Sequence, residues 1–262
     1  MSIIDTHAHV DMSQFRDDLD AVLDRARRAG VARILCVGVD LPSSRRCVEL
    51  ANLYPDVIRA AVGIHPNDWS EAAPGDFASL EDLAALPEVV AVGETGLDFY
   101  RDRTPVEAQV TGLRRHIELA RAVDKPLIIH ARKSDERVLE ELARGGSGLR
   151  GVRHCFDGSS EVAERYTACG FSIAVGGVVT RPGYKKLKAA LRALPADRLM
   201  VETDCPYQTP ASRAGSRNEP AFLVETVRAL AEIRAESVTQ VASATTQAAE
   251  RLFFPDAAGR QG

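Results

Sequence analysis

Residues 89–131, VVAVGETGLDFYRDRTPVEAQVTGLRRHIELARAVDKPLIIHA, contain one complete strand–helix–strand repeat. A short apolar run at Val89–Glu94 is followed by a long segment of helical period at Pro105–Val123 and by a second apolar run at Pro126–Ala131. Such alternation is typical of parallel sheets, whose strands are joined by crossover helices. Pro105 suits the first helical turn, where an N–H group has no partner. The segment therefore predicts a parallel βα architecture.

The same alternation runs through all 262 residues. The predicted strands are Ile3–His9, Arg33–Val37, Val57–Ile64, Val89–Glu94, Pro126–Ala131, Gly151–His154, Phe171–Val175 and Leu199–Thr203. The predicted helices are Asp18–Ala29, Pro42–Leu53, Phe77–Leu86, Pro105–Val123, Asp135–Ala143, Ser160–Cys169, Gly183–Ala193, Ala221–Ile233 and Ser237–Leu252. Eight βα units in a chain of this length predict an α/β fold with a single (β/α)8 TIM barrel, one domain over residues 1–262. The alternative is a doubly wound open sheet.

Composition narrows the function classes. A net charge of −4 and a pI near 5.9 argue against binding nucleic acid mainly through bulk electrostatics. A phosphate-containing substrate would then need local positive charge or bound cations. The N-terminus has no basic leader, and no apolar run approaches the roughly 20 residues of a membrane helix. We therefore expect no membrane association, and the cytoplasm as location.

Five of the six histidines lie at or just after the carboxyl end of a predicted strand: His7, His9, His65, His130 and His154. Only His116 lies within a predicted helix. Barrel enzymes build their active sites at the carboxyl ends of the strands. The distribution of histidines therefore predicts a site at that end.

His7 and His9 are two residues apart on the first strand, so both rings can face one cavity and bind one metal ion. For an isolated pair, one ring that caps a loop and one that is solvated is an equal alternative. Asp5 lies on the same strand face. It either orients a ring or is a buried, hydrogen-bonded strand residue.

Metal-binding side chains also follow other apolar strands. Glu94 ends the fourth strand, where a lone buried carboxylate is costly unless a cation compensates it, and its two oxygens can bridge two cations. The other strand-end groups are His130, His154 and Asp204. Each alone could be an ordinary hydrogen-bonded residue. Together they predict a metal-dependent hydrolase, because mixed N/O ligands suit Zn²⁺, Mn²⁺, Fe²⁺ or Mg²⁺ more than Ca²⁺.

The sequence resembles the TatD family of metal-dependent deoxyribonucleases over residues 5 to 254, nearly the whole chain. The motifs that carry the resemblance, in family order, are Asp5-Thr6-His7-Ala8-His9, Gly63-Ile64-His65-Pro66, Glu94-Thr95-Gly96-Leu97-Asp98, His130-Ala131-Arg132, His154-Cys155-Phe156-Asp157-Gly158, Glu202-Thr203-Asp204-Cys205-Pro206-Tyr207 and Arg217-Asn218-Glu219-Pro220. Two positions depart from the family pattern. Asp157 replaces a small residue such as serine, and Thr246-Gln247 replaces a Thr-rich stretch that contains asparagine.

The resemblance implies a TIM-barrel enzyme of the amidohydrolase type that binds two divalent cations and cleaves DNA, usually as an exonuclease, with DNA repair or degradation as the expected role. By motif position, one metal binds His7 and His9, and the other binds His130 and His154. Glu94 bridges the metals and Asp204 completes the site. His65 and Arg132 face the phosphate, although His65 could instead be a further ligand. The extra carboxylate of Asp157 puts substrate affinity and specificity in question.

These residues support hydrolysis through a metal-bridged hydroxide. Asp204 is the predicted general base, and Glu202, on the same strand face, can assist it. Arg132 suits two phosphate oxygens at once. We expect single-stranded 3′ ends as substrate, because a metal pair at the bottom of a barrel mouth cannot reach a phosphate inside an intact duplex. Tyr100, with Trp69, Phe99 and Tyr207, is best placed to stack on a base, although each alone could be an ordinary packing residue. Basic residues that could guide the strand are Arg101, Arg103, Arg181, Lys185, Lys186, Arg213 and Arg217.

Two other functions compete with this prediction. The same ligands could activate water to attack a small ester, amide, lactone or phosphotriester, because fold and metals do not fix the group attacked. A protein of another class, a non-catalytic barrel that binds metal or a partner, fits less well with a complete ligand set. The native cation, among Mg²⁺, Mn²⁺ and Zn²⁺, is left open. A monomer is expected, because no amphipathic segment is left over after the barrel helices.

Overall fold

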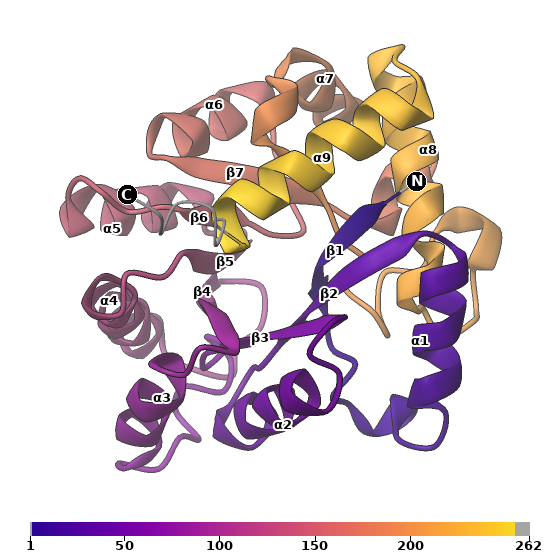
Figure 1. Cartoon of the computed structure of the whole chain (residues 1–262). Helices are drawn as coiled ribbons and strands as arrows, with labels where there is room; N and C mark the ends of the chain where they lie inside the picture. The colour runs from indigo at the N-terminus through magenta and orange to yellow at the C-terminus, as the bar shows by residue number, and fades with distance from the viewer. Residues whose placement is uncertain (1, 255–262) are drawn as a thin grey trace, which may run out of the picture. The chain divides into compact units, whose positions relative to one another are not determined.

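A computed structural model describes residues 2–254 of the chain. Within them, eight parallel strands alternate with helices (Figure 1) and follow one another in the sheet in chain order. This order is that of a (β/α)8 barrel, so the predicted fold class is confirmed. The strands are β1 (Ile3–Ala8), β2 (Val31–Val37), β3 (Ile58–Val62), β4 (Val89–Asp98), β5 (Leu127–Arg132), β6 (Gly151–Arg153), β7 (Phe171–Val175) and β8 (Leu199–Val201).

The helices lie close to their predicted bounds. They are α1 (Leu19–Arg28), α2 (Leu41–Leu53), α3 (Asp76–Ala84), α4 (Val106–Ala122), α5 (Asp135–Gly145), α6 (Ser160–Ala168), α7 (Lys185–Ala193), α8 (Leu223–Arg234) and α9 (Val238–Phe253). Pro105 is the residue before α4 rather than in its first turn, because its ψ of 141° is extended. Among residues 2–254, no helix combines the length and apolar character needed to cross a membrane.

The chain divides into two compact units. Within residues 2–254, the first unit takes up the chain to Leu35, Cys155–Thr167 and the chain from Ser172 onward. The second unit takes up Cys36–His154 and Ala168–Phe171. β1 and β7 are buried along their whole length, as expected of parallel strands with helices outside them. That the chain acts as one domain stays a prediction.

Strand β4 is longer than the sequence predicted. It continues to Asp98, so Glu94 lies inside the strand and not at its end, which corrects the sequence prediction. Val92 pairs with Leu127, but Thr95 pairs with Ile129, so β4 has one extra residue between these pairs. Such a bulge redirects a side chain while the strand continues. The bulge therefore explains how a charged residue, Glu94, stands within an otherwise apolar strand.

The segment of β4 after the bulge lies unusually close to β5. Gly96 pairs with His130 and has a φ of +143°, which L side chains rarely adopt. A Cβ atom on Gly96 would lie 1.9 Å from the carbonyl oxygen of His130. Only glycine therefore allows the two strands to approach at the residue that carries this imidazole.

The substitution Gly96→Ala should lower the free energy of unfolding by roughly 2–4 kcal/mol, because the methyl group collides with backbone that cannot move aside locally. The matched control is Gly75→Ala in the same unit, where an added Cβ meets nothing within 4 Å. Urea unfolding followed by circular dichroism measures both variants. Equal stability of the two would contradict the close approach of β4 and β5.

Candidate metal centres

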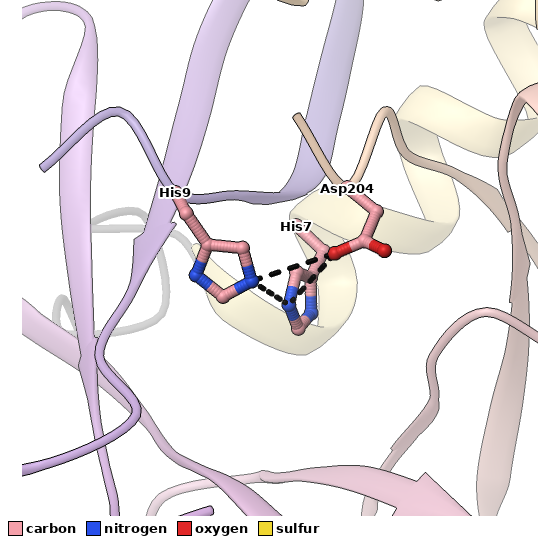
Figure 2. A group of neighbouring side chains, drawn as sticks. All are labelled: His7, His9 and Asp204. Atoms are coloured by element: carbon pink, nitrogen blue, oxygen red, sulfur yellow. Dashed lines mark hydrogen bonds and ion pairs between the residues drawn. The ribbon is translucent and has the colours of Figure 1, made fainter. Parts of the chain in front are cut away.

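The first unit brings together three of the predicted ligands, His7, His9 and Asp204 (Figure 2). The Nε2 atoms of His7 and His9 are 3.2 Å apart. The Oδ1 atom of Asp204 lies 3.4 Å from Nε2 of His9 and 3.8 Å from Nε2 of His7. The two rings and the carboxylate point toward one another (Figure 2). We call this group the β1 cluster.

Asp204 is held by the loop that follows β8. Its φ is 55°, in the left-handed region, and its backbone N–H donates to the His7 carbonyl at 2.8 Å. Nδ2 of Asn218 donates to the carbonyls of Thr203, at 2.8 Å, and Tyr207, at 2.6 Å. These bonds fasten the loop on both sides of Asp204. A strained backbone fixed in this way is typical of functional sites.

Asp5 supports the same loop. Its carboxylate accepts hydrogen bonds from the backbone and hydroxyl of Thr203, at 2.9 and 2.6 Å, and from the His7 backbone at 3.3 Å. Burial raises the pKa of Asp5 to about 7. Its partners are thus those of a buried strand residue, the second of the two sequence interpretations. Glu202 follows β8, is fully buried, and accepts a hydrogen bond from the Cys155 backbone.

The second unit brings three imidazoles to one carboxylate oxygen. Oε1 of Glu94 lies 2.8 Å from Nδ1 of His130 and 2.8 Å from Nε2 of His154. Nε2 of His65 lies 3.7 Å from the same oxygen. The Glu94 side chain is only 5% exposed. We call this group the Glu94 cluster.

The electrostatics of the Glu94 cluster suit a cation. Burial, with His130 nearby, lowers the pKa of His65 to about 3, so its imidazole is neutral and keeps a lone pair for a metal. Burial would raise the pKa of Asp98, but the nearby His130 and the hydrogen bonds from Arg101, Tyr100 and Asn67 outweigh this effect. The pKa of Asp98 is therefore well below its usual range, and this carboxylate is charged beside the cluster.

Both clusters have donor atoms of the number and type that a divalent cation requires. In each, three potential ligand atoms from three different side chains lie within 4.8 Å of one another. Imidazole nitrogen mixed with carboxylate oxygen fits Zn²⁺, Mn²⁺ or Fe²⁺, and less well Ca²⁺. Each unit thus carries residues that could hold a divalent cation.

Two predicted substrate-binding residues lie together in the second unit. β5 continues to Arg132, whose guanidinium carbon lies 3.9 Å from the centre of the Tyr100 ring. The ammonium of Lys133 lies 4.9 Å from the same ring. Tyr100 is 56% exposed. The pair forms a cationic and aromatic surface two residues beyond His130.

The other predicted aromatic residues differ in their surroundings. Trp69 packs edge-on against Phe77 and His116, so its ring is part of the packing of its unit. Phe99 is 37% exposed beside Tyr100. Tyr207 is 50% exposed, and its ring centre lies 6.3 Å from that of His9.

Several of the predicted guiding cations have partners within their own unit. Arg217 pairs with Asp18 at 2.7 Å, and Arg213 with Glu225 at 3.0 Å. Arg181 donates to the Thr209 carbonyl at 3.1 Å. The exposed members of the set are Arg101, Arg103, Lys185, Lys186 and Arg213, and the extra carboxylate of Asp157 is exposed as well.

Sequence reasoning missed two supporting residues, Asp98 and Asn218. Asp98 lies 3.4 Å from Nε2 of His130, and Asn218 fastens the loop around Asp204. Both stand in quoted motifs, Glu94–Asp98 and Arg217–Pro220, which was the available signal. Their roles depend on hydrogen bonds between distant segments, which no local pattern reveals.

A parallel βα chain that gathers imidazoles and carboxylates in and just after its strands has the fold of a metal-dependent hydrolase and side chains that could hold its metal. The family model described as TatD related DNase matches residues 4–254. The chain belongs to this family.

Relatives and solved structures agree with this assignment. The chain is 40% identical over 252 residues to the uncharacterized metal-dependent hydrolase YabD of Bacillus subtilis (strain 168), covering 96% of this chain and 98% of YabD. It is 37% identical to a protein of Rahnella sp. (strain Y9602) named 3′-5′ ssDNA/RNA exonuclease TatD, covering 92% and 94% of the two chains. The structure of YJJV, a TatD homologue from Escherichia coli K12, matches with a TM-score of 0.90 at 33% identity, covering 96% of this chain and 97% of YJJV.

The remaining histidine, His116, fixes the backbone beside His65. Its Nε2 accepts a hydrogen bond from the Ile64 N–H at 3.0 Å, and its Nδ1 donates to the Gly112 carbonyl at 2.7 Å. The residue is fully buried, and burial lowers its pKa from 6.5 to about 4. The neutral ring is therefore the form that holds Ile64.

Acid should weaken this arrangement in a defined pH window. Because the folded pKa of about 4 lies below the unfolded value of 6.5, the contribution of His116 is complete above pH 6.5 and is lost as the pH falls through about 4. Between pH 8 and pH 4, wild type should lose roughly 3 kcal/mol more stability than His116→Gln, which has no titrating ring. Urea unfolding across this range measures the difference. Parallel pH profiles of the two proteins would show that His116 is not buried in neutral form.

Proposed function

We propose that this chain is a metal-dependent nuclease that removes nucleotides from the 3′ ends of single-stranded DNA. The observation that carries the proposal is the Arg132–Tyr100 pair, which adjoins the Glu94 cluster through His130 on the same strand. A guanidinium suits a phosphate and an exposed ring suits a base, and neither is needed to hydrolyse a small apolar ester. Relatives named 3′-5′ ssDNA/RNA exonuclease, 34–37% identical, support the same substrate class.

The metal sites follow from the two clusters. His7, His9 and Asp204 would hold one divalent cation, and His130, His154 and Glu94 the other. His65, which is 3.7 Å from Glu94, is proposed as a further ligand or phosphate contact. Bound divalent cations supply a nucleophile from water at neutral pH and neutralise phosphate charge. Glu94 as a bridge between cations stays a prediction.

The remaining roles belong to the side chains themselves. Asp204 would accept the proton of the attacking water, because its Oδ1 faces the Nε2 atoms of His7 and His9, where the cation would bind. Gln208 Nε2 donates to Oδ2 of Asp204 at 3.0 Å and keeps the carboxylate in place. Glu202 is proposed to assist. Arg132 would bind two phosphate oxygens, and Tyr100 would stack on the terminal base.

The decisive assay uses a 5′-labelled single-stranded DNA oligonucleotide and metal-stripped protein resupplied with Mg²⁺, Mn²⁺ or Zn²⁺. We expect a ladder that shortens from the 3′ end and is slower by about 10²–10⁴-fold in a Glu94→Ala, Asp204→Ala double variant, because ligands and base are lost together. The matched control is Asp56→Ala, Glu161→Ala, which removes one exposed carboxylate from each unit. The same assay with RNA compares the two sugars. Failure of folded, metal-loaded protein to cut either polymer would favour a small-ester or phosphotriester hydrolase.

Each cluster should contribute one bound metal ion, so that a variant of one cluster loses one ion and keeps the other. Wild type is expected to retain two Zn²⁺ per chain after dialysis, whereas His9→Ala and His130→Ala should each retain one, since each removes a ligand from one cluster. Inductively coupled plasma mass spectrometry gives the stoichiometry. Two ions retained in both variants would show that the cations bind elsewhere.

A further inference from the structure

We propose that Asp98 is a positioning residue that fixes the ring of His130, so that Nε2–H points to Asp98 and Nδ1 points to the Glu94 cluster. Nδ1 of His130 makes a hydrogen bond with Oε1 of Glu94 at 2.8 Å, whereas its Nε2 faces Oδ2 of Asp98 at 3.4 Å, an ion-pair distance without a hydrogen bond. A cation at Nδ1 would displace the proton from that nitrogen and leave it on Nε2, toward Asp98. β4 thus provides a carboxylate for each nitrogen of the ring. The inference rests on the proposed metal-dependent function.

Asp98 is itself held firmly. It is 1% exposed, and its Oδ1 accepts the backbone N–H groups of Tyr100 at 2.8 Å and Arg101 at 3.0 Å. Its Oδ2 accepts Nδ2 of Asn67 at 3.1 Å. The side chain of Gln109 bonds to both the N–H and the carbonyl of Asp98, at 2.8 and 3.1 Å. With both oxygens and its peptide groups fixed, Asp98 cannot turn away from His130.

This arrangement determines which nitrogen can bind a cation. A neutral imidazole carries one proton, and the nitrogen without it offers the lone pair. A carboxylate that accepts Nε2–H keeps the proton there, orients the ring, and makes Nδ1 a stronger donor. The nitrogen left for the metal is the one that faces Glu94 and His154.

The same carboxylate also reaches the proposed substrate surface, because Oδ1 holds the backbone at Tyr100. Asp98→Asn separates the two roles. The amide oxygen can still accept from Tyr100 and Arg101, while the NH₂ group replaces the acceptor that faces His130 and Asn67. The variant therefore removes the contact with His130 and keeps the turn.

The first test is the affinity for Zn²⁺ alone, measured by competition with a chromogenic chelator in a His9→Ala background that leaves the Glu94 cluster as the site. Asp98→Asn should bind Zn²⁺ about 10–100-fold more weakly, the usual loss when a partner of a ligating histidine is removed. The control is Asp40→Asn, which changes a helix-capping carboxylate of the same unit that accepts from the Ser43 backbone at 2.7 Å. Unchanged affinity in Asp98→Asn, or an equal loss in both variants, would overturn the proposal.

The second test takes its main readout from the wild-type protein. Long-range ¹⁵N–¹H spectra of Zn²⁺-loaded wild type with labelled histidine, assigned by His130→Gln, should give the proton of His130 on Nε2. In Asp98→Asn this signal should shift or broaden, which a loss of stability alone would not produce. A proton on Nδ1 of His130 would overturn the proposal. Neither test uses a nucleic acid, so a failed nuclease assay and a failed role for Asp98 remain distinguishable.

Discussion

The burial of the Glu94 carboxylate among imidazoles is the constraint on which the second unit depends. A carboxylate that is 5% exposed loses most of its hydration, and this loss is tolerable only with hydrogen bonds or a cation nearby. Three features of β4 and β5 meet this requirement. The bulge redirects Glu94, Gly96 allows the strands to approach, and His130 then lies at 2.8 Å from the carboxylate. The geometry of the site thus follows from backbone features of the sheet.

The fold and the gathering of histidines and carboxylates could be predicted from the sequence because they depend on local patterns. Alternating apolar runs and helical segments predicted the strands, and polar residues at strand ends predicted that His7 would lie near Asp204, and His130 near Glu94. The length of β4 could not be predicted, because the prediction ended the strand where the apolar run ends, at Glu94. In the structure the strand continues past this residue through a bulge at Gly93–Glu94. Asp98 and Asn218 were missed for a different reason. Their importance lies in contacts with residues on other segments, at 3.4 Å from His130 and 2.8 Å from the Thr203 carbonyl.

The two clusters are built by different means. In the Glu94 cluster, β4 carries Glu94 at its bulge and β5 carries His130, and the pairing of these two strands fixes the distance between the side chains. In the β1 cluster, Asp204 lies on a loop whose left-handed backbone is fastened by Asn218 and by Asp5 through Thr203. This chain therefore has one cluster on the sheet itself and the other partly on a loop, where small changes in hydrogen bonding alter the position of the carboxylate.

Each compact unit contains a group of side chains that could hold a metal ion, and this has a thermodynamic consequence. A ligand that binds only the folded form stabilises it by RT ln(1 + [L]/Kd), about 2.7 kcal/mol at one hundred times Kd. A cation held by the β1 cluster would thus make the opening of the first unit less favourable, and a cation held by the Glu94 cluster would do the same for the second unit. Removal of one ion by a chelator would then destabilise mainly the unit that had held it. Amide hydrogen exchange along the chain would show which of the two units had become less protected.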